Sequence, residues 1–172
     1  MSWAIMRHGE AGPAVRDAER PLTLAGRDVV IANAQRLLTT GVQPFAIVHS
    51  PLLRARETAE LVRDTAYPEV QCMVDNALLP SGSPQGILDL LVGMDVGIAS
   101  ETTERDILLV GHQPLIGHLA ADLAGRLVSV QPGTILGMSL MEPDPPSAES
   151  ERLIEEGKIG FNREYSLTWI IE

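Results

Sequence analysis

The sequence is poor in cysteine, in aromatic residues and in long apolar runs. The single cysteine, Cys72, cannot form an internal disulfide and argues against a cysteine-based metal site. No apolar stretch approaches the ~20 residues that a membrane-spanning helix needs, and the N-terminus lacks the pattern of a signal peptide. Aromatic residues make up only 3% of the chain, so the core must consist mainly of aliphatic side chains. These features predict a cytoplasmic protein.

Positive charge is also scarce, because the formal net charge is -10 and the pI is about 4.8. Nucleic acids and anionic membranes are bound by basic surfaces, so we expect neither as a partner. A phosphate site in so acidic a chain would have to consist of a few focused cations. The 172 residues lie within the usual size of one domain, and we expect a single domain over residues 1–172 and a monomer.

Strand and helix patterns alternate along the chain. Apolar runs predict strands at 2–7, 44–50, 69–74, 106–112, 134–140 and 165–171. Helical spacing predicts helices at 23–40, 51–64, 84–92 and 113–124. This alternation predicts an α/β fold with three layers, a mostly parallel mixed sheet and helices on both faces. Between the last two strands we expect mainly loop, including the proline-rich, acidic stretch 143–151, so they should form an antiparallel C-terminal edge.

Three predicted strands end in basic or polar residues of related chemistry. The carboxyl ends of parallel strands meet at one edge of a sheet, where ligands bind in such folds. We therefore expect one crevice to contain Arg7, His8, Arg54 and His112, with His49 and Ser50 nearby. A lone arginine or histidine at a strand end is usually a rim or structural residue. The agreement of three strand ends favours a site.

These residue types suit a phosphoryl group. Arginine offers planar, bidentate donors to phosphate oxygens, and helices starting near Pro51 and Gln113 would add free backbone N–H groups. A neutral imidazole can attack phosphorus, and a second, protonated imidazole can stabilise the equatorial oxygens. Gly9 would let the backbone approach the ligand. We expect no metal, because arginines repel a cation and the histidines lack metal-ligand spacing; His118 is interpreted as structural.

Four segments resemble the histidine phosphatase superfamily, also called phosphoglycerate-mutase-like. They are "MRHGEA", "HSPLLRARETAE", "LLVGHQPLIGHL" and "ERPLTLAGR", and the last is similar to a segment of the small bacterial phosphohistidine phosphatases. The resemblance runs from residue 2 to about 140. It implies that His8 is the nucleophile and that Arg7, Arg54 and His112 bind the phosphoryl group, with His112 charged. It implies no metal or organic cofactor.

One feature of many relatives is missing. They carry a glutamate shortly before a glycine after the third strand, as proton donor to the leaving group. Here leucines occupy the matching place before Gly82. Substitute donors are Glu10, which adjoins the nucleophile, and the surface acids Asp17, Glu19 and Asp75.

The missing acid bears on the substrate. An alkoxide is a poor leaving group, and a placed acid speeds its departure by roughly 10²–10⁴-fold, whereas the imidazole of phosphohistidine can take up a proton near neutral pH. The sequence therefore favours a phosphatase that acts on protein phosphohistidine through a covalent intermediate on His8. A small-molecule phosphomonoesterase and a non-catalytic phosphoprotein-binding module remain as alternatives.

Overall fold

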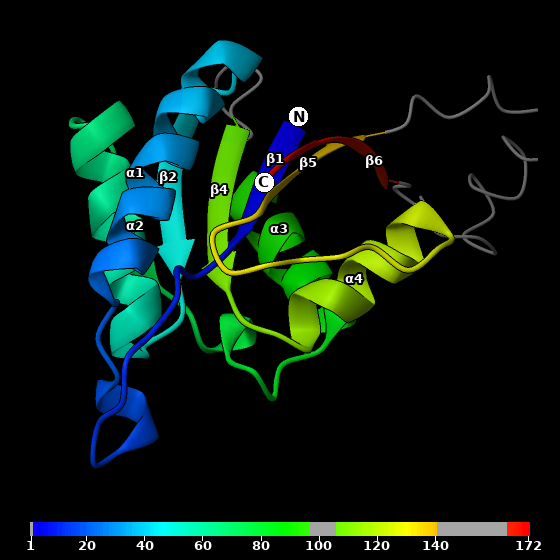
Figure 1. Cartoon of the computed structure of the whole chain (residues 1–172). Helices are drawn as coiled ribbons and strands as arrows, with labels where there is room; N and C mark the ends of the chain where they lie inside the picture. The colour runs from blue at the N-terminus through cyan, green and yellow to red at the C-terminus, as the bar shows by residue number, and fades with distance from the viewer. Residues whose placement is uncertain (1, 97–105, 141–164) are drawn as a thin grey trace, which may run out of the picture.

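Six strands form one sheet between two helical layers (Figure 1) within residues 2–96, 106–140 and 165–172, which the computed structural model describes. The strands are β1 (Ser2–Arg7), β2 (Pro44–His49), β3 (Gln71–Val74), β4 (Asp106–Gly111), β5 (Ile135–Leu140) and β6 (Tyr165–Ile171). The α-helices are α1 (Leu24–Leu37), α2 (Leu53–Ala66), α3 (Pro84–Val96) and α4 (Leu115–Ala124). Short 3₁₀ turns are η1 (Asp17–Glu19), η2 (Leu38–Thr40) and η3 (Asn76–Leu78). The acidic stretch 143–151 lies outside the described residues.

The strand order is β3-β2-β4-β1-β5-β6. Strands β3, β2, β4 and β1 run parallel to one another, while β5 runs antiparallel to β1 and β6 antiparallel to β5. Figure 1 shows α1 and α2 on one face of the sheet and α3 and α4 on the other. The predicted α/β architecture with an antiparallel C-terminal edge is therefore confirmed.

Alternation along the central strands places their side chains in two separate cores. Met6 and Val110 pack with Val30 of α1 and Ala59 of α2 in one core. Their neighbours in sequence point to the opposite face, where Leu109 packs in a second core with Leu91 of α3 and Leu119 of α4. Because successive residues of a strand face opposite ways, an apolar run buried on both faces is what a covered parallel sheet requires.

Capping residues mark the ends of the helices, and two helices begin later than the sequence predicted. The Thr23 hydroxyl accepts from the Gly26 N–H at 2.9 Å and caps α1, and Gly41 follows η2 with a left-handed φ of 80°. Pro51, expected in the first helical turn, lies before α2. The helix expected from residue 113 begins at Leu115, after the cis Gln113–Pro114 peptide bond.

The carboxyl ends of the central strands are tied to one another. The His8 N–H donates to the Gly111 carbonyl at 3.1 Å, and the Ser50 N–H donates to the Val110 carbonyl at 3.2 Å. These bonds hold the ends of β1 and β2 on either side of the end of β4. None of the helices in the described ranges is both long enough and apolar enough to cross a membrane.

Candidate active site

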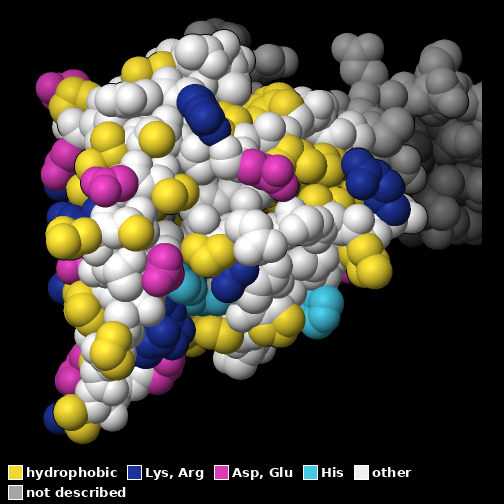
Figure 2. Space-filling model, viewed as in Figure 1, with side chains coloured by type: hydrophobic (Ala, Val, Ile, Leu, Met, Phe, Trp, Pro, Cys, Tyr) yellow, Lys and Arg dark blue, Asp and Glu magenta, His cyan; other side chains and the backbone are white. Residues whose placement is uncertain are grey.

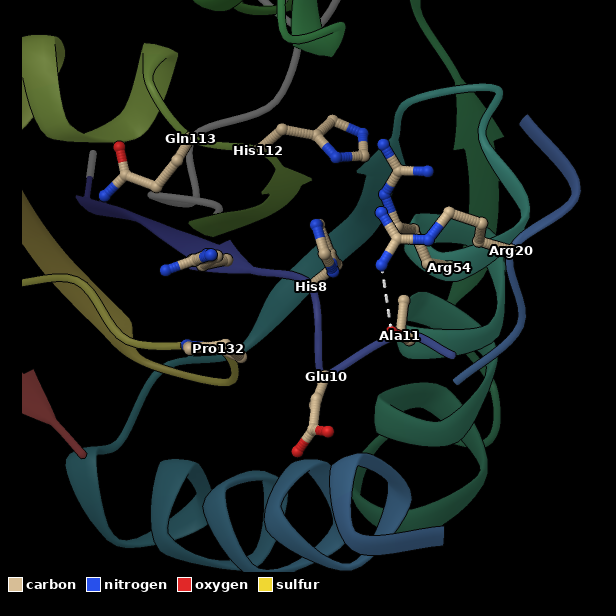
Figure 3. Close-up of a pocket in the computed structure, with 9 residues that line it drawn as sticks. His8, Glu10, Ala11, Arg20, Arg54, His112, Gln113 and Pro132 are labelled. Atoms are coloured by element: carbon tan, nitrogen blue, oxygen red, sulfur yellow. Dashed lines mark hydrogen bonds between the residues drawn. The ribbon is translucent and has the colours of Figure 1, made fainter. Parts of the chain in front are cut away.

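A cavity of about 300 Å³ opens at the carboxyl ends of the parallel strands. It is lined by Arg7, His8, Glu10, Ala11, Arg20, Arg54, His112, Gln113 and Pro132 (Figure 3). Figure 2 shows histidine and arginine colouring side by side in a hollow of the surface, so the cavity is accessible from solvent. Arginine and histidine donors around a solvent-accessible cavity suit an oxyanion.

His8 follows the end of β1, and a backbone contact fixes its ring. Its Nδ1 lies 2.7 Å from the Gly9 carbonyl, which can only accept a hydrogen bond. Nδ1 therefore carries the hydrogen, and the neutral ring has its lone pair on Nε2. An imidazole in this tautomer can attack an electrophile through Nε2.

His112 follows the end of β4 and faces His8 across the cavity, with ring centroids 4.8 Å apart. Its Nε2 lies 2.5 Å from the hydroxyl of Ser50, which follows β2. Its Nδ1 is buried and has no hydrogen-bond partner among the described residues. Buried polar atoms usually have partners, so Nδ1 is an atom that a ligand in the cavity could satisfy.

Burial and neighbouring positive charge favour the neutral form of both histidines. Burial is the main cause that lowers the pKa of His8 to about 4 and that of His112 to about 3, and the charges of Arg54 and Arg7 lower both further. Neutral His8 is the nucleophilic form. For His112, the lowered pKa means that the charged form implied by the resemblance would need the negative charge of a bound phosphoryl group to offset burial and the neighbouring arginines.

Arg54 lies in the first turn of α2 and is buried. It donates to the Asp17 carbonyl at 2.8 Å and to the Asp17 carboxylate at 3.1 Å. The bond from Arg54 is the main cause that lowers the pKa of Asp17, so this carboxylate stays ionised. Asp17 therefore holds Arg54 in place and is a poor proton donor, contrary to one of the options drawn from the sequence.

Arg7 is oriented by the loop that precedes β5. Its guanidinium donates to the Val130 carbonyl at 2.7 Å, and its Nε is buried without a partner among the described residues. The Gly133 N–H contacts the carbonyls of Arg7 and His8 at 3.1 and 3.2 Å. Gly133 has a φ of 88°, which explains a glycine at this turn. Sequence reasoning missed this loop because it belongs to no strand or helix.

Arg20 also lines the cavity, although the sequence analysis did not predict it as a site residue. It lies in the loop between β1 and α1, where it donates to the carbonyls of Gly12 at 2.9 Å and Ala11 at 3.0 Å. Figure 3 shows its side chain beside that of Arg54. The signal was present, since Arg20 belongs to the segment "ERPLTLAGR" singled out in the sequence. A loop residue, however, cannot be placed by strand register.

Gly9 does not line the cavity. A Cβ at this position would lie 2.8 Å from Val30 Cγ2 and 2.9 Å from the Gly26 carbonyl, so the glycine makes room for α1. The Gly9 N–H donates to Thr58 of α2 at 3.1 Å. We therefore correct the expected reason for this glycine, and we leave Gly9 out of the phosphate-binding set proposed below.

Glu10 is the acidic residue among the described residues that line the cavity. Its side chain points away from His8 toward α1 (Figure 3). Asp75 instead caps η3 by accepting from the Ala77 N–H at 2.7 Å, and Glu19 pairs with Arg16 at 3.4 Å. Leu78, in the leucine pair before Gly82, is fully buried in the core. The described part of the cavity thus has no carboxyl group aimed at His8.

Two further histidines are outside the cavity lining. His49 is buried at the end of β2, and its Nδ1 contacts the Ser50 carbonyl at 2.8 Å. His118, interpreted from the sequence as structural, is instead exposed on α4 and is a surface residue. In contrast, Arg7, His8, Arg54 and His112 come together as predicted from the strand ends.

Comparison with known proteins decides the family. A family model of the histidine phosphatase superfamily (branch 1) matches residues 3–78. The phosphohistidine phosphatase SixA of Escherichia coli (strain K12) is 34% identical over 120 residues, which cover 69% of this chain and 71% of SixA. The chain belongs to the histidine phosphatase superfamily. Within it, the chain groups with the small phosphohistidine phosphatase branch, and its family identifies it as a phosphatase.

Two other relatives support this placement of the histidine phosphatase. A SixA homolog of Haemophilus influenzae (strain ATCC 51907 / DSM 11121 / KW20 / Rd) is 32% identical over 146 residues, covering 78% of this chain and 85% of the relative. The solved structure of the protein histidine phosphatase SixA complexed with tungstate matches with a TM-score of 0.77 and 26% identity. That match covers 99% of this chain and 96% of the other.

Proposed function

We propose that this histidine phosphatase removes phosphate from protein phosphohistidine through a covalent phosphohistidine intermediate on His8. The observation that carries the proposal is the His8 tautomer, because the Gly9 carbonyl occupies Nδ1 and leaves Nε2 as the nucleophile. The named function of the SixA relatives, which share the sequence across most of the chain, supports the choice of substrate.

The reaction takes two steps. His8 Nε2 attacks phosphorus, the bond from phosphorus to the substrate imidazole breaks, and the leaving nitrogen takes a proton from solvent. Water then attacks phospho-His8, which releases inorganic phosphate and regenerates neutral His8. Arg7 and Arg54 bind the equatorial oxygens in both steps, and His112 donates a hydrogen bond to them. Positioned donors of this kind stabilise the charge of the transferring group.

The acids around the cavity favour an activated phosphate as substrate. The Glu10 carboxylate turns away from His8, and Asp17 is held ionised by Arg54. An alkyl phosphate would need a proton at its leaving oxygen, and a placed acid is worth roughly 10²–10⁴-fold in rate. Phosphohistidine needs it less, because its imidazole can take up a proton from solvent near neutral pH.

A substrate panel tests this function. The purified protein is assayed on a histidine-phosphorylated protein, an aryl phosphate and an alkyl phosphate, with His8→Ala and the surface variant His118→Ala alongside. We expect phosphohistidine to be hydrolysed at least about 10²-fold faster than the alkyl phosphate, because no carboxyl group in the described part of the cavity is aimed at His8. Comparable rates would indicate a small-molecule phosphomonoesterase, and tight binding without any turnover would indicate a binding module.

A further inference from the structure

We propose that Ser50 is a positioning residue that fixes the tautomer of His112, so that His112 presents its Nδ1–H to the phosphoryl group. Ser50 lies between β2 and α2 and is fully buried. It is absent from the cavity lining, so it would act through His112 and not by touching the substrate.

The hydroxyl of Ser50 has two neighbours. Its oxygen accepts from the Leu52 N–H at 3.4 Å and lies 2.5 Å from His112 Nε2. A hydroxyl carries one hydrogen, and Nε2 is the acceptor available to it among the described residues. Ser50 therefore donates to Nε2, which must be the unprotonated ring nitrogen.

The other ring nitrogen then carries the hydrogen. His112 is 1% exposed, and its Nδ1 has no partner in the part of the chain that the structure describes. An N–H at this position is a donor that a bound oxyanion satisfies. The opposite tautomer would turn a lone pair toward the oxyanion and would leave the Ser50 hydrogen without an acceptor. Both ends of the ring therefore favour the same tautomer.

The neutral form of His112, which its low pKa favours, carries one ring proton. Burial, His8, Arg54 and Arg7 lower the pKa of His112 and Asp17 raises it, which leaves the pKa at about 3. In a neutral imidazole the partner of one nitrogen decides the protonation of the other. A neutral His112 can donate from Nδ1 only in the Nδ1–H tautomer. The contact with Ser50 selects that tautomer.

The inference rests on the proposed phosphoryl role of His112, but the position of the ring proton can be measured without any substrate. Nitrogen-15 NMR of the labelled protein near neutral pH separates protonated from unprotonated ring nitrogens, and His112→Gln identifies the His112 signals by their loss. We expect a protonated Nδ1 and an unprotonated Nε2. A protonated Nε2 in the native protein would overturn the proposal, even if phosphohistidine is hydrolysed.

Variants extend the test to ligand binding. In Ser50→Ala we expect a shift of the tautomer population away from Nδ1–H and a loss of affinity for inorganic phosphate of about five- to tenfold, the effect of one neutral hydrogen bond. Ser50→Thr keeps the hydroxyl and should restore both. Thr134→Val is the matched control, because Thr134 has a buried hydroxyl without a partner among the described residues.

The outcomes separate the two proposals. An unchanged tautomer and unchanged phosphate affinity in Ser50→Ala would refute the positioning role. If Ser50→Ala does not fold, the native spectrum alone decides. The predicted tautomer in a protein that does not hydrolyse phosphohistidine would leave the Ser50 inference standing and would refute the proposed function.

Discussion

His8 and His112 face each other across the cavity, with their ring centroids 4.8 Å apart and their planes inclined by 55°. At this distance two imidazolium ions would repel each other, and both rings are largely removed from water. Each ring also has one nitrogen bound to the protein, Nδ1 of His8 and Nε2 of His112. The pair therefore offers one nucleophilic nitrogen and one donor nitrogen while both rings stay neutral.

The first prediction concerns the titration of this pair. Because burial lowers the pKa of His8 to about 4 and that of His112 to about 3, neither ring should gain a proton between pH 8 and pH 5. NMR titration of the native protein measures this directly, and the urea-unfolded chain provides ordinary histidines near 6.5 as reference. A midpoint above 6 for His8 in the native protein would contradict the account.

The same pKa values predict how stability depends on pH. The unfolded chain binds more protons than the folded one between about pH 6.5 and pH 4, so stability is retained above this window and falls as the pH is lowered through it. We expect the melting temperature to drop between pH 7 and pH 5, and His112→Gln to reduce the drop. An equal drop in both proteins would show that other groups cause the acid sensitivity.

A third prediction concerns Arg20, which lines the cavity and holds the carbonyls of Gly12 and Ala11. Arg20→Ala should weaken binding of inorganic phosphate on the order of tenfold, the effect of a hydrogen bond to a charged group. Arg16→Ala is the matched control, because Arg16 is an arginine of the same loop that pairs with Glu19 at the surface. Isothermal titration calorimetry compares them, and equal affinities would exclude a direct role for Arg20.

A fourth prediction concerns the contact between α1 and the loop that follows His8. A Cβ on Gly26 would lie 2.3 Å from the Glu10 carbonyl, so the backbone would have to move. Gly26→Ala should lower the free energy of unfolding by about 1–3 kcal/mol and weaken phosphate binding. Gly93→Ala should instead stabilise by about 0.5–1 kcal/mol, because among the described residues no atom beyond its own stretch of α3 lies within 4 Å of the Cβ position.

Urea unfolding distinguishes these two variants. If Gly26→Ala is as stable as the native protein and binds phosphate equally well, the loop after His8 is not held by this contact.

The site residues that could be predicted from the sequence are those whose positions depend on the strands of the sheet. Arg7, His8 and His112 come at or directly after strand ends, and Arg54 comes in the first turn of the helix that follows β2, so a parallel sheet brings them together. Arg20 was missed because its loop has no register with the sheet. The partners of the rings were missed too, since only the folded chain brings Ser50 against His112.

The protonation state of buried side chains could not be predicted from the sequence either. The sequence analysis assigned a positive charge to His112, because a cation suits a phosphate site. The fold buries the ring near Arg54 and Arg7, which lowers the pKa of His112 and disfavours that proton. Asp17 likewise looked like an ordinary surface acid, whereas the fold makes it the partner of Arg54.

The central claim is that His8 carries the phosphoryl group. The most direct measurement is to mix the protein with a phosphorylated substrate, stop the reaction with alkali within the first turnover, and map the phosphate by mass spectrometry. We predict an alkali-stable, acid-labile phosphate on the imidazole of His8, absent from His8→Ala and present in His118→Ala. Turnover with no phosphate on His8, or undiminished turnover by His8→Ala, would contradict the account.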